Sequence, residues 1–213
     1  MTPLQAAILG LVEGITEYLP ISSTGHLIIT ASLLGLDGAN AADPAEGARV
    51  KAAVDAFNII IQGGAILAVV GLYFPRFVQM LRGLLGRDNA GFMLLVNLML
   101  AFLPAAVLGQ LLDEWLEKRL FFPGPVVAAL AIGGVYMLLV DQRRRGGWAP
   151  RGVGPRPASG LKGVEDLRPH EALFIGFMQC IAMIPGTSRS MMTITAGYFV
   201  KLRPAAAAEF SFL

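Results

Sequence analysis

The sequence predicts an all-α polytopic membrane protein, and three observations support this fold class. The chain has 213 residues, of which 55% are hydrophobic and only 15% charged, whereas a soluble domain carries about 25% charged residues. The charges are confined to blocks, and two apolar regions are interrupted near their middle by polar turns. A net charge of +2 argues against a nucleic-acid partner, and the single cysteine, Cys180, excludes an intramolecular disulfide framework.

The first 36 residues (1–36) are predicted to form a re-entrant hairpin instead of a single membrane span. This mostly apolar stretch is cut by the polar segment from Pro20 to His26. Each half has roughly 10–16 residues, whereas a helix that crosses the hydrocarbon core needs about 20. Non-helical backbone at such a depth is tolerated only where it packs in protein or lines a wet cavity. The hairpin would therefore carry a polar turn into the membrane.

Three transmembrane helices are predicted next, because three apolar runs reach the required length. The connecting loops differ in charge: residues 75–90 and 141–170 together hold ten Lys and Arg, and the connections on the opposite side hold four. Positive loops favour the cytoplasmic side, so 141–170 is predicted to be a cytoplasmic loop and the N-terminus to lie outside. The predicted spans are 52–74, 91–112 and 122–140.

Residues 171–200 are predicted to form a second re-entrant hairpin, which is cut by the polar segment 185–190. A glycine and then a polar residue recur alike in the two hairpins, and a Pro and a Ser/Thr-rich turn follow in both. Three crossings between the copies make an inverted-topology repeat, an architecture that builds its site from broken helices of both halves. Residues 204–213 are predicted to begin a further helix. We therefore expect the second half of the repeat to be truncated in this chain.

Glu13 and Glu17 are the acidic candidates for a site. They lie four residues apart, so they share one face of a helix. An acidic side chain inside a membrane segment costs on the order of 3 kcal/mol on insertion scales, which favours a functional role. The pair suits a divalent cation with hard oxygen ligands, Mg²⁺ or Ca²⁺. The alternative is that both carboxylates lie at the outer interface and are only solvated.

The turn after Pro20 carries the candidate nucleophiles. A single hydroxyl there is explained by helix N-capping, but several hydroxyls together with a histidine at membrane depth are not. Ser23 and His26 are three residues apart, so one helical turn could bring a hydroxyl and an imidazole together; alternatively, His26 itself attacks phosphorus. Ser22 and Thr24 are the neighbouring candidates for substrate binding.

Arg189 is the candidate anion-binding residue of the second hairpin, since it is the only Lys or Arg between Arg168 and Lys201. Its guanidinium offers a permanent charge and a fork of donors that suits phosphate. The alternative is a cation that snorkels to the cytoplasmic interface. The flanking hydroxyls Thr187, Ser188 and Ser190 are candidate substrate-binding groups, as is Gln62, which could equally form an interhelical hydrogen bond.

These motifs together resemble the undecaprenyl-diphosphatase family, also called bacitracin-resistance proteins. The resemblance rests on EGITEYLPISSTGH at residues 13–26 and PGTSRS at 185–190, supported by FNIIIQGGAILAVV at 57–70 and AEFSFL at 208–213. It covers essentially the whole chain. It implies an integral membrane enzyme of the bacterial inner membrane that removes the terminal phosphate from undecaprenyl diphosphate. The product is the lipid carrier of cell-wall precursors.

The resemblance also implies a divalent-cation-dependent hydrolase whose pocket faces the periplasmic side, with a polyprenyl diphosphate and membrane lipids as its partners. A homodimer is compatible with the sequence. A transporter or flippase of the polyprenyl phosphate carrier is the alternative, because inverted repeats with broken helices are typical of transporters. The family's acidic, Ser/His and Arg motifs fall on Glu13, Glu17, Ser22, Ser23, Thr24, His26, Ser188 and Arg189.

Overall fold

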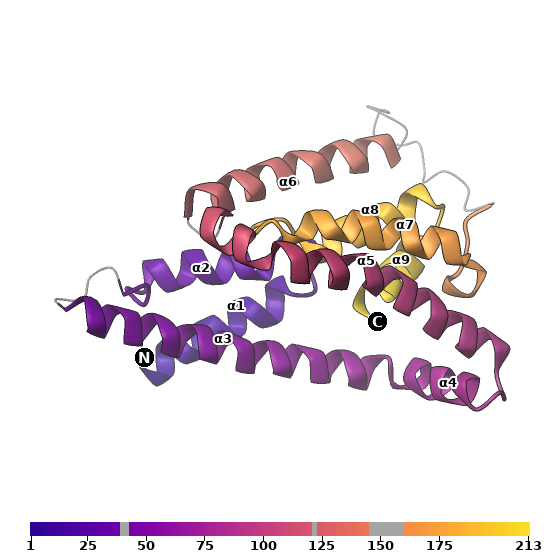
Figure 1. The fold of residues 1–213 in the computed structure, drawn as a ribbon, viewed down its shortest axis with the longest axis horizontal. Coiled ribbons are helices and arrows are strands. Elements are labelled where there is room, and N and C mark those ends of the chain that lie inside the picture. Colours follow the sequence, from indigo (N-terminus) through magenta and orange to yellow (C-terminus); the bar gives the residue numbers. More distant parts are fainter. Residues whose placement is uncertain (39–42, 121–122, 145–159) are drawn as a thin grey trace, which may run out of the picture.

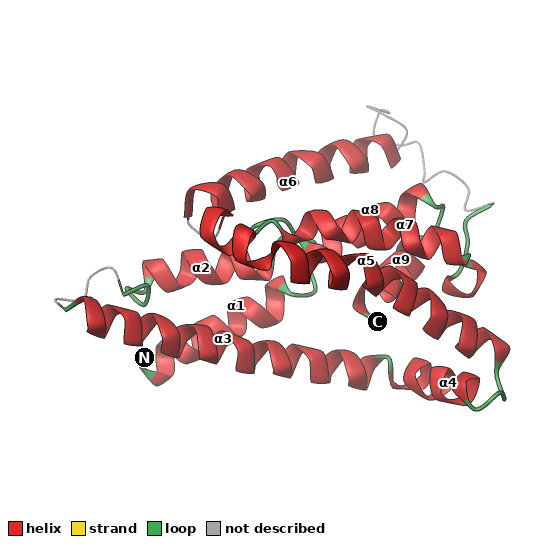
Figure 2. Ribbon diagram, viewed as in Figure 1, coloured by secondary structure: helices red, strands yellow, loops and turns green. Residues whose placement is uncertain are grey.

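The computed structural model describes residues 1–38, 43–120, 123–144 and 160–213, and their regular structure is helical (Figures 1 and 2). The extended pairing seen within these residues is an isolated bridge between Lys162 and Leu202. The all-α prediction is therefore confirmed for this part of the chain. The major part of the predicted loop 141–170, namely 145–159, lies outside the described residues, as does residue 122 of a predicted span.

The described residues form two short helix pairs, three long helices and two further short helices. In Figure 1, α3 follows one long edge of the molecule and α6 the opposite edge; α2, α7 and α8 lie between them in this view, and α1 crosses α3. The helices are α1 (Pro3–Thr16), α2 (Ser23–Leu33), α3 (Pro44–Leu72), α4 (Phe74–Leu84), α5 (Asn89–Leu120), α6 (Pro123–Arg144), α7 (Pro169–Cys180), α8 (Arg189–Phe199) and α9 (Pro204–Phe212), with the 3₁₀ turns η1 (Val164–Asp166) and η2 (Ile181–Met183).

Within the part of the chain that the structure describes, three helices are long and apolar enough to cross a membrane: Pro44–Leu72, Asn89–Leu112 and Gly124–Arg143. Helix α3 begins well before the predicted span 52–74, because Asp43 caps its first turn and Pro44 occupies the first helical position. A prediction based on charge-free residues finds only the part of a helix inside the hydrocarbon. It misses the first turns of α3, because the helix extends beyond the hydrocarbon and contains charged residues there. Only 6% of the apolar window of α3 is buried within the protein, so the rest of its surface suits lipid.

The larger core cluster forms where α7 packs on α5. Ala172 and Ile175 of α7 are fully buried there, with Leu94 and Ala101 of α5. Gly176 permits this close approach, because a Cβ at that position would collide with the backbone carbonyl of Ala101. Small residues at such crossings are the usual device of helix packing in membranes. The packing of α7 fixes the start of the second helix pair against a long apolar helix.

We expect Gly176→Ala to lower the free energy of unfolding by about 1–3 kcal/mol, the usual cost of overpacking a well-packed core. The midpoint of thermal unfolding in detergent measures the effect. Gly134→Ala in α6 is the matched control, since no atom lies within 4 Å of the added Cβ. Equal losses in the two variants would contradict the role assigned to Gly176.

An ionic cluster joins α4, η1 and α9. The guanidinium of Arg76 donates from Nε to Glu209 Oε1 over 2.5 Å and pairs through Nη2 with Glu165 Oε1 over 2.7 Å. Its third nitrogen donates to Gln79 Oε1 over 2.8 Å. Hydrogen bonds from its own backbone N–H and from Arg76 lower the pKa of Glu165. The cluster fixes the position of α9, whose last turn reaches the polar turns described below.

Replacing Glu209 with Gln should lower the free energy of unfolding by about 1–2 kcal/mol, because a partly buried charge-assisted hydrogen bond is lost. Glu165→Gln should cost less, since its side chain is 47% exposed and its ion pair is screened by solvent. A pH titration of unfolding adds a second check. Because the pKa of folded Glu165 lies below the ordinary 4.5, its contribution is complete above about 4.5 and is lost as the pH falls through the lower value. Equal destabilisation by both variants would contradict this ranking.

Candidate active site

The turn between α1 and α2 is shaped by a proline and an unusual serine. Helix α1 ends at Thr16, with Glu17 as its last capping residue, and Pro20 cannot continue a helix. Ser22 then adopts a φ of +66° and caps α2 by accepting a hydrogen bond at its hydroxyl from the N–H of Gly25. A positive φ is uncommon for a residue other than glycine and is concentrated at functional sites. This backbone places several hydroxyls of the turn at the start of α2.

The turn before α8 is built differently. The N–H of Thr187 donates to the carbonyl of Ile184 over 2.9 Å, and Gly186 has a φ of +93°, as a type II turn with Pro-Gly at its centre requires. A Cβ on Gly186 would also collide with the carbonyl of Val126 in α6. Ser188 then caps α8 by accepting at its hydroxyl from the N–H of Met191 over 3.2 Å. Arg189 is therefore the first helical residue after a fixed turn.

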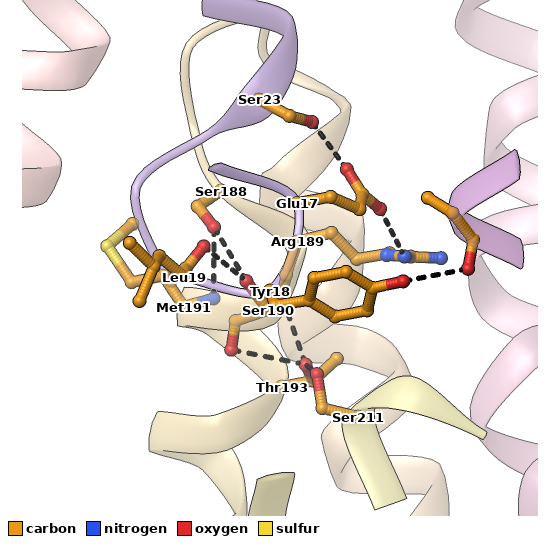
Figure 3. A network of polar contacts seen from close by, with 11 residues as sticks. Glu17, Tyr18, Leu19, Ser23, Ser188, Arg189, Ser190, Met191, Thr193 and Ser211 are labelled. Carbon is orange, nitrogen blue, oxygen red and sulfur yellow. Dashed lines mark hydrogen bonds and ion pairs between the residues drawn. The ribbon is translucent and has the colours of Figure 1, made fainter. Parts of the chain in front are cut away.

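The two turns meet, although 172 residues separate their charged partners (Figure 3). Arg189 donates from Nη2 to Glu17 Oε1 over 3.1 Å. Ser190 donates from its hydroxyl to the carbonyl of Leu19 over 3.3 Å, which is a second link between the turns. The side chain of Arg189 is 56% exposed and that of Glu17 is 25% exposed, so the guanidinium is still accessible to an anion.

Glu17 also binds the serine of the first turn, so that one carboxylate lies between a hydroxyl and a guanidinium (Figure 3). The hydroxyl of Ser23 donates to Glu17 Oε2 over 2.5 Å. The predicted pairing of Ser23 with His26 is wrong in this structure, because Nδ1 of His26 donates to the carbonyl of Ser22 over 2.8 Å. A carbonyl can only accept, so Nδ1 carries the hydrogen of this contact. Ser23 therefore pairs with Glu17 at the end of α1, and not with a residue one turn further along α2.

A polar pocket of about 310 Å³ opens at this junction. Thr24 and Gln62 line it together with groups from both turns, and Gln62 brings α3 into the wall. Glu13 and His26 are not among its lining residues. Of the sequence-predicted site residues, the structure brings nine into the wall of this pocket: Glu17, Ser22, Ser23, Thr24, Gln62, Thr187, Ser188, Arg189 and Ser190.

Glu13 lies one helical turn before Glu17, since the N–H of Glu17 donates to the carbonyl of Glu13 over 2.9 Å. Its carboxylate is buried, and both oxygens lack a hydrogen-bond partner. Within the described residues, no group of three or more His, Cys, Asp or Glu side chains could hold a metal ion. Mg²⁺, however, is usually held by only one or two carboxylates together with substrate phosphates. The unpartnered Glu13 and the neighbouring Glu17 therefore fit a cation that arrives with its substrate.

The structure adds positioning residues that the sequence reasoning missed. Tyr18 donates from its hydroxyl to the carbonyl of Ala65 over 2.9 Å and packs edge-on against Phe212. The hydroxyl of Thr193 donates to the carbonyl of Arg189 over 3.0 Å and lies 2.6 Å from the hydroxyl of Ser211. These contacts connect the turns to α3 and α9 (Figure 3). In the sequence, only the position of Tyr18 next to Glu17 indicated a role for Tyr18. No sequence pattern near Thr193 indicates its contact with Ser211 of α9.

Comparison with known proteins identifies a family. Residues 6–213 match the family described as bacitracin resistance protein BacA. The chain belongs to this family. Membership and the three long apolar helices together support a membrane protein.

Relatives within the family carry a common name. The undecaprenyl-diphosphatase of Sorangium cellulosum is 44% identical over 98% of this chain and 61% of its own length. That of Pseudomonas putida is 45% identical over 99% of this chain and 67% of its own length. The Clostridium tetani protein is 36% identical over 98% of this chain and 68% of its own length. The chain thus spans about two thirds of the length of these relatives.

Proposed function

We propose that the protein hydrolyses undecaprenyl diphosphate to undecaprenyl phosphate and inorganic phosphate. The observation that carries the proposal is the Ser23–Glu17–Arg189 arrangement in a polar pocket. It offers a nucleophile, a base and a permanent positive charge, which are the groups that phosphoryl transfer requires. The names of the relatives support the substrate. Release of the carrier lipid for another round of cell-wall synthesis would account for the bacitracin resistance in the family description.

Ser23 is the nucleophile that the geometry favours. Its oxygen forms a bond to the terminal phosphorus as its proton passes to Glu17 Oε2, the atom that it already contacts. The bond between that phosphorus and the bridging oxygen breaks, and undecaprenyl phosphate leaves. Water then attacks the phosphoserine, phosphate departs, and the proton held by Glu17 returns to Ser23. Direct attack by water and attack by His26 are the alternatives that trapping of a phosphorylated residue would distinguish.

Arg189 neutralises charge on the diphosphate. Its ion pair with Glu17 is half-exposed, so an incoming phosphate can share the guanidinium through its remaining donors. The N-terminus of α8 adds free N–H groups, which also favour an anion. Mg²⁺ or Ca²⁺ held by Glu13 and Glu17 would supply further charge neutralisation. Stabilisation of this kind is the principal contribution of protein groups in phosphoryl transfer.

The membrane placement is part of the proposal. The pairs α1–α2 and α7–α8 would be re-entrant hairpins of an inverted-topology repeat, with the pocket toward the periplasmic side of the bacterial inner membrane. Two observations support this: both pairs consist of short helices joined by a polar turn, and Lys and Arg concentrate in the sequence segments 75–90 and 141–170. Contact between the two turns is what a repeat-built site requires.

Phosphate release in detergent micelles tests the proposal. Purified protein is mixed with undecaprenyl diphosphate and Mg²⁺, and inorganic phosphate is measured over time. We expect release that stops with a chelator and returns with Mg²⁺ or Ca²⁺. A protein that moves the lipid only across sealed vesicles, and releases no phosphate in micelles, would be a transporter and would overturn the proposal.

A further inference from the structure

A second and larger cavity lies on the other side of Arg189. It has a volume of about 510 Å³, within the range of small-molecule sites. Its walls come from α4, α5, α7, α8 and α9, and most of the side chains are apolar. Leu81 and Leu84 of α4 are among the lining residues. This cavity has no part in the chemistry described above.

Arg189 lines both the polar pocket and this cavity, so the two spaces share one wall. Two hydroxyls of the cavity wall lie near that residue: Thr193 donates to the carbonyl of Arg189 and contacts Ser211, and both residues line the cavity. Gln179 is the further polar residue in the described lining. The lining from α4 and α5 is apolar. The combined space therefore suits an anion at one end, near Arg189, and an apolar group along the remainder.

We propose that this cavity holds the isoprenoid chain of a polyprenyl diphosphate while the diphosphate occupies the polar pocket. The inference rests on the proposed function, because it assigns the cavity to the same substrate. An amphiphile with one anionic end and one long apolar end matches the distribution of polarity around Arg189. The chain would extend from the first turn of α8 along α5 toward α4.

The cavity acts on orientation more than on affinity. Lipid tails are as apolar as leucine side chains, so transfer of an isoprenoid from the membrane into the cavity gains little hydrophobic free energy. A fixed chain does, however, direct the diphosphate toward Arg189 and Ser23, and alignment of reacting groups lowers the barrier. Long substrates should therefore benefit more than short ones, whose tails end before α4.

Two adjacent leucines offer a matched test. Leu84 and Leu85 are each 63% exposed, but only Leu84 lines the cavity. We expect Leu84→Trp to lower kcat/KM for undecaprenyl diphosphate about tenfold, while values for the three-isoprene farnesyl diphosphate stay within about twofold. Leu85→Trp should change neither. Equal losses for both substrates, or equal effects of the two variants, would overturn the inference. Leu81→Trp provides a second substitution in the same wall.

Photolabelling separates this inference from the proposed function. A polyprenyl diphosphate analogue that carries a benzophenone beyond its third isoprene unit should label peptides 77–82 and 83–87, and unlabelled undecaprenyl phosphate should compete while phospholipid does not. Labelling without phosphate release would support the cavity and contradict the enzyme. Phosphate release with labelling elsewhere would overturn the cavity alone, as would equal competition by phospholipid. A disulfide between two copies of Leu84→Cys would assign the cavity to a dimer contact and also overturn it.

Discussion

Arg189→Lys should lower kcat/KM for phosphate release about a hundredfold, and Arg189→Ala should lower it further. Loss of one preorganised donor typically costs this much in transition-state stabilisation. Lysine keeps the charge but loses the planar fork that binds two oxygens at once. In this protein the fork has two tasks, since one nitrogen already pairs with Glu17 over 3.1 Å. The single ammonium of a lysine could not bind Glu17 and two phosphate oxygens with the same geometry.

The measurement is phosphate release in micelles at several substrate concentrations, together with the thermal midpoint to show that the variant is folded. Arg82→Ala is the control, because Arg82 is an exposed cation of α4 that lines neither cavity. Turnover near the native value in Arg189→Lys would contradict the role of the fork. A loss in Arg82→Ala as large as in Arg189→Ala would indicate a general effect of positive charge instead.

Glu17→Gln should reduce kcat by about two to four orders of magnitude, the usual range for removal of a general base. The amide has the same shape, but it cannot take the proton of Ser23, and it loses the charge that pairs with Arg189. A structural role alone would lower the thermal midpoint together with kcat, whereas loss of the base should lower kcat in a protein that still melts near the native midpoint.

Glu13→Gln tests the proposed cation site separately from the proposed general base. Glu13 does not line the pocket and makes no hydrogen bond through its carboxylate, so its contribution would be through a bound cation. We expect this variant to raise the Mg²⁺ concentration needed for half-maximal rate, and the rate to recover partly at high Mg²⁺. Glu17→Gln should not recover. Glu165→Gln, in the ionic cluster far from the reacting groups, should leave the rate unchanged.

The lengths of the apolar segments were sufficient to predict the all-α fold class and the three long helices α3, α5 and α6. Helix starts were less predictable, because a charge-free run ends where the hydrocarbon ends and a helix need not. Asp43 and Pro44 show the limit: they are a normal cap and first residue, but they lie outside the apolar stretch. The short helix α4 was also missed, since Phe74–Leu84 follows a span and carries the positive charges of a loop.

The polar turns were predictable because chemistry-bearing residues in apolar surroundings are conspicuous. Their contacts were not, since each contact joins residues that no local rule connects. The spacing of three between Ser23 and His26 suggested a pair within α2. The carbonyl of the N-cap Ser22, however, accepts from His26, and Ser23 contacts Glu17. The Tyr18–Ala65 and Thr193–Ser211 contacts likewise depend on how α3 and α9 pack.

The junction between Glu17 and Arg189 also has a consequence for synthesis of the protein. With 172 residues between them, a ribosome needs on the order of ten seconds to deliver the arginine after the glutamate. Until then the nascent chain holds the carboxylate and the serine without their cation. The proposed site can therefore form only after α8 has begun to emerge, and a chain whose insertion stalls after α6 would hold only the half of it that the first turn supplies.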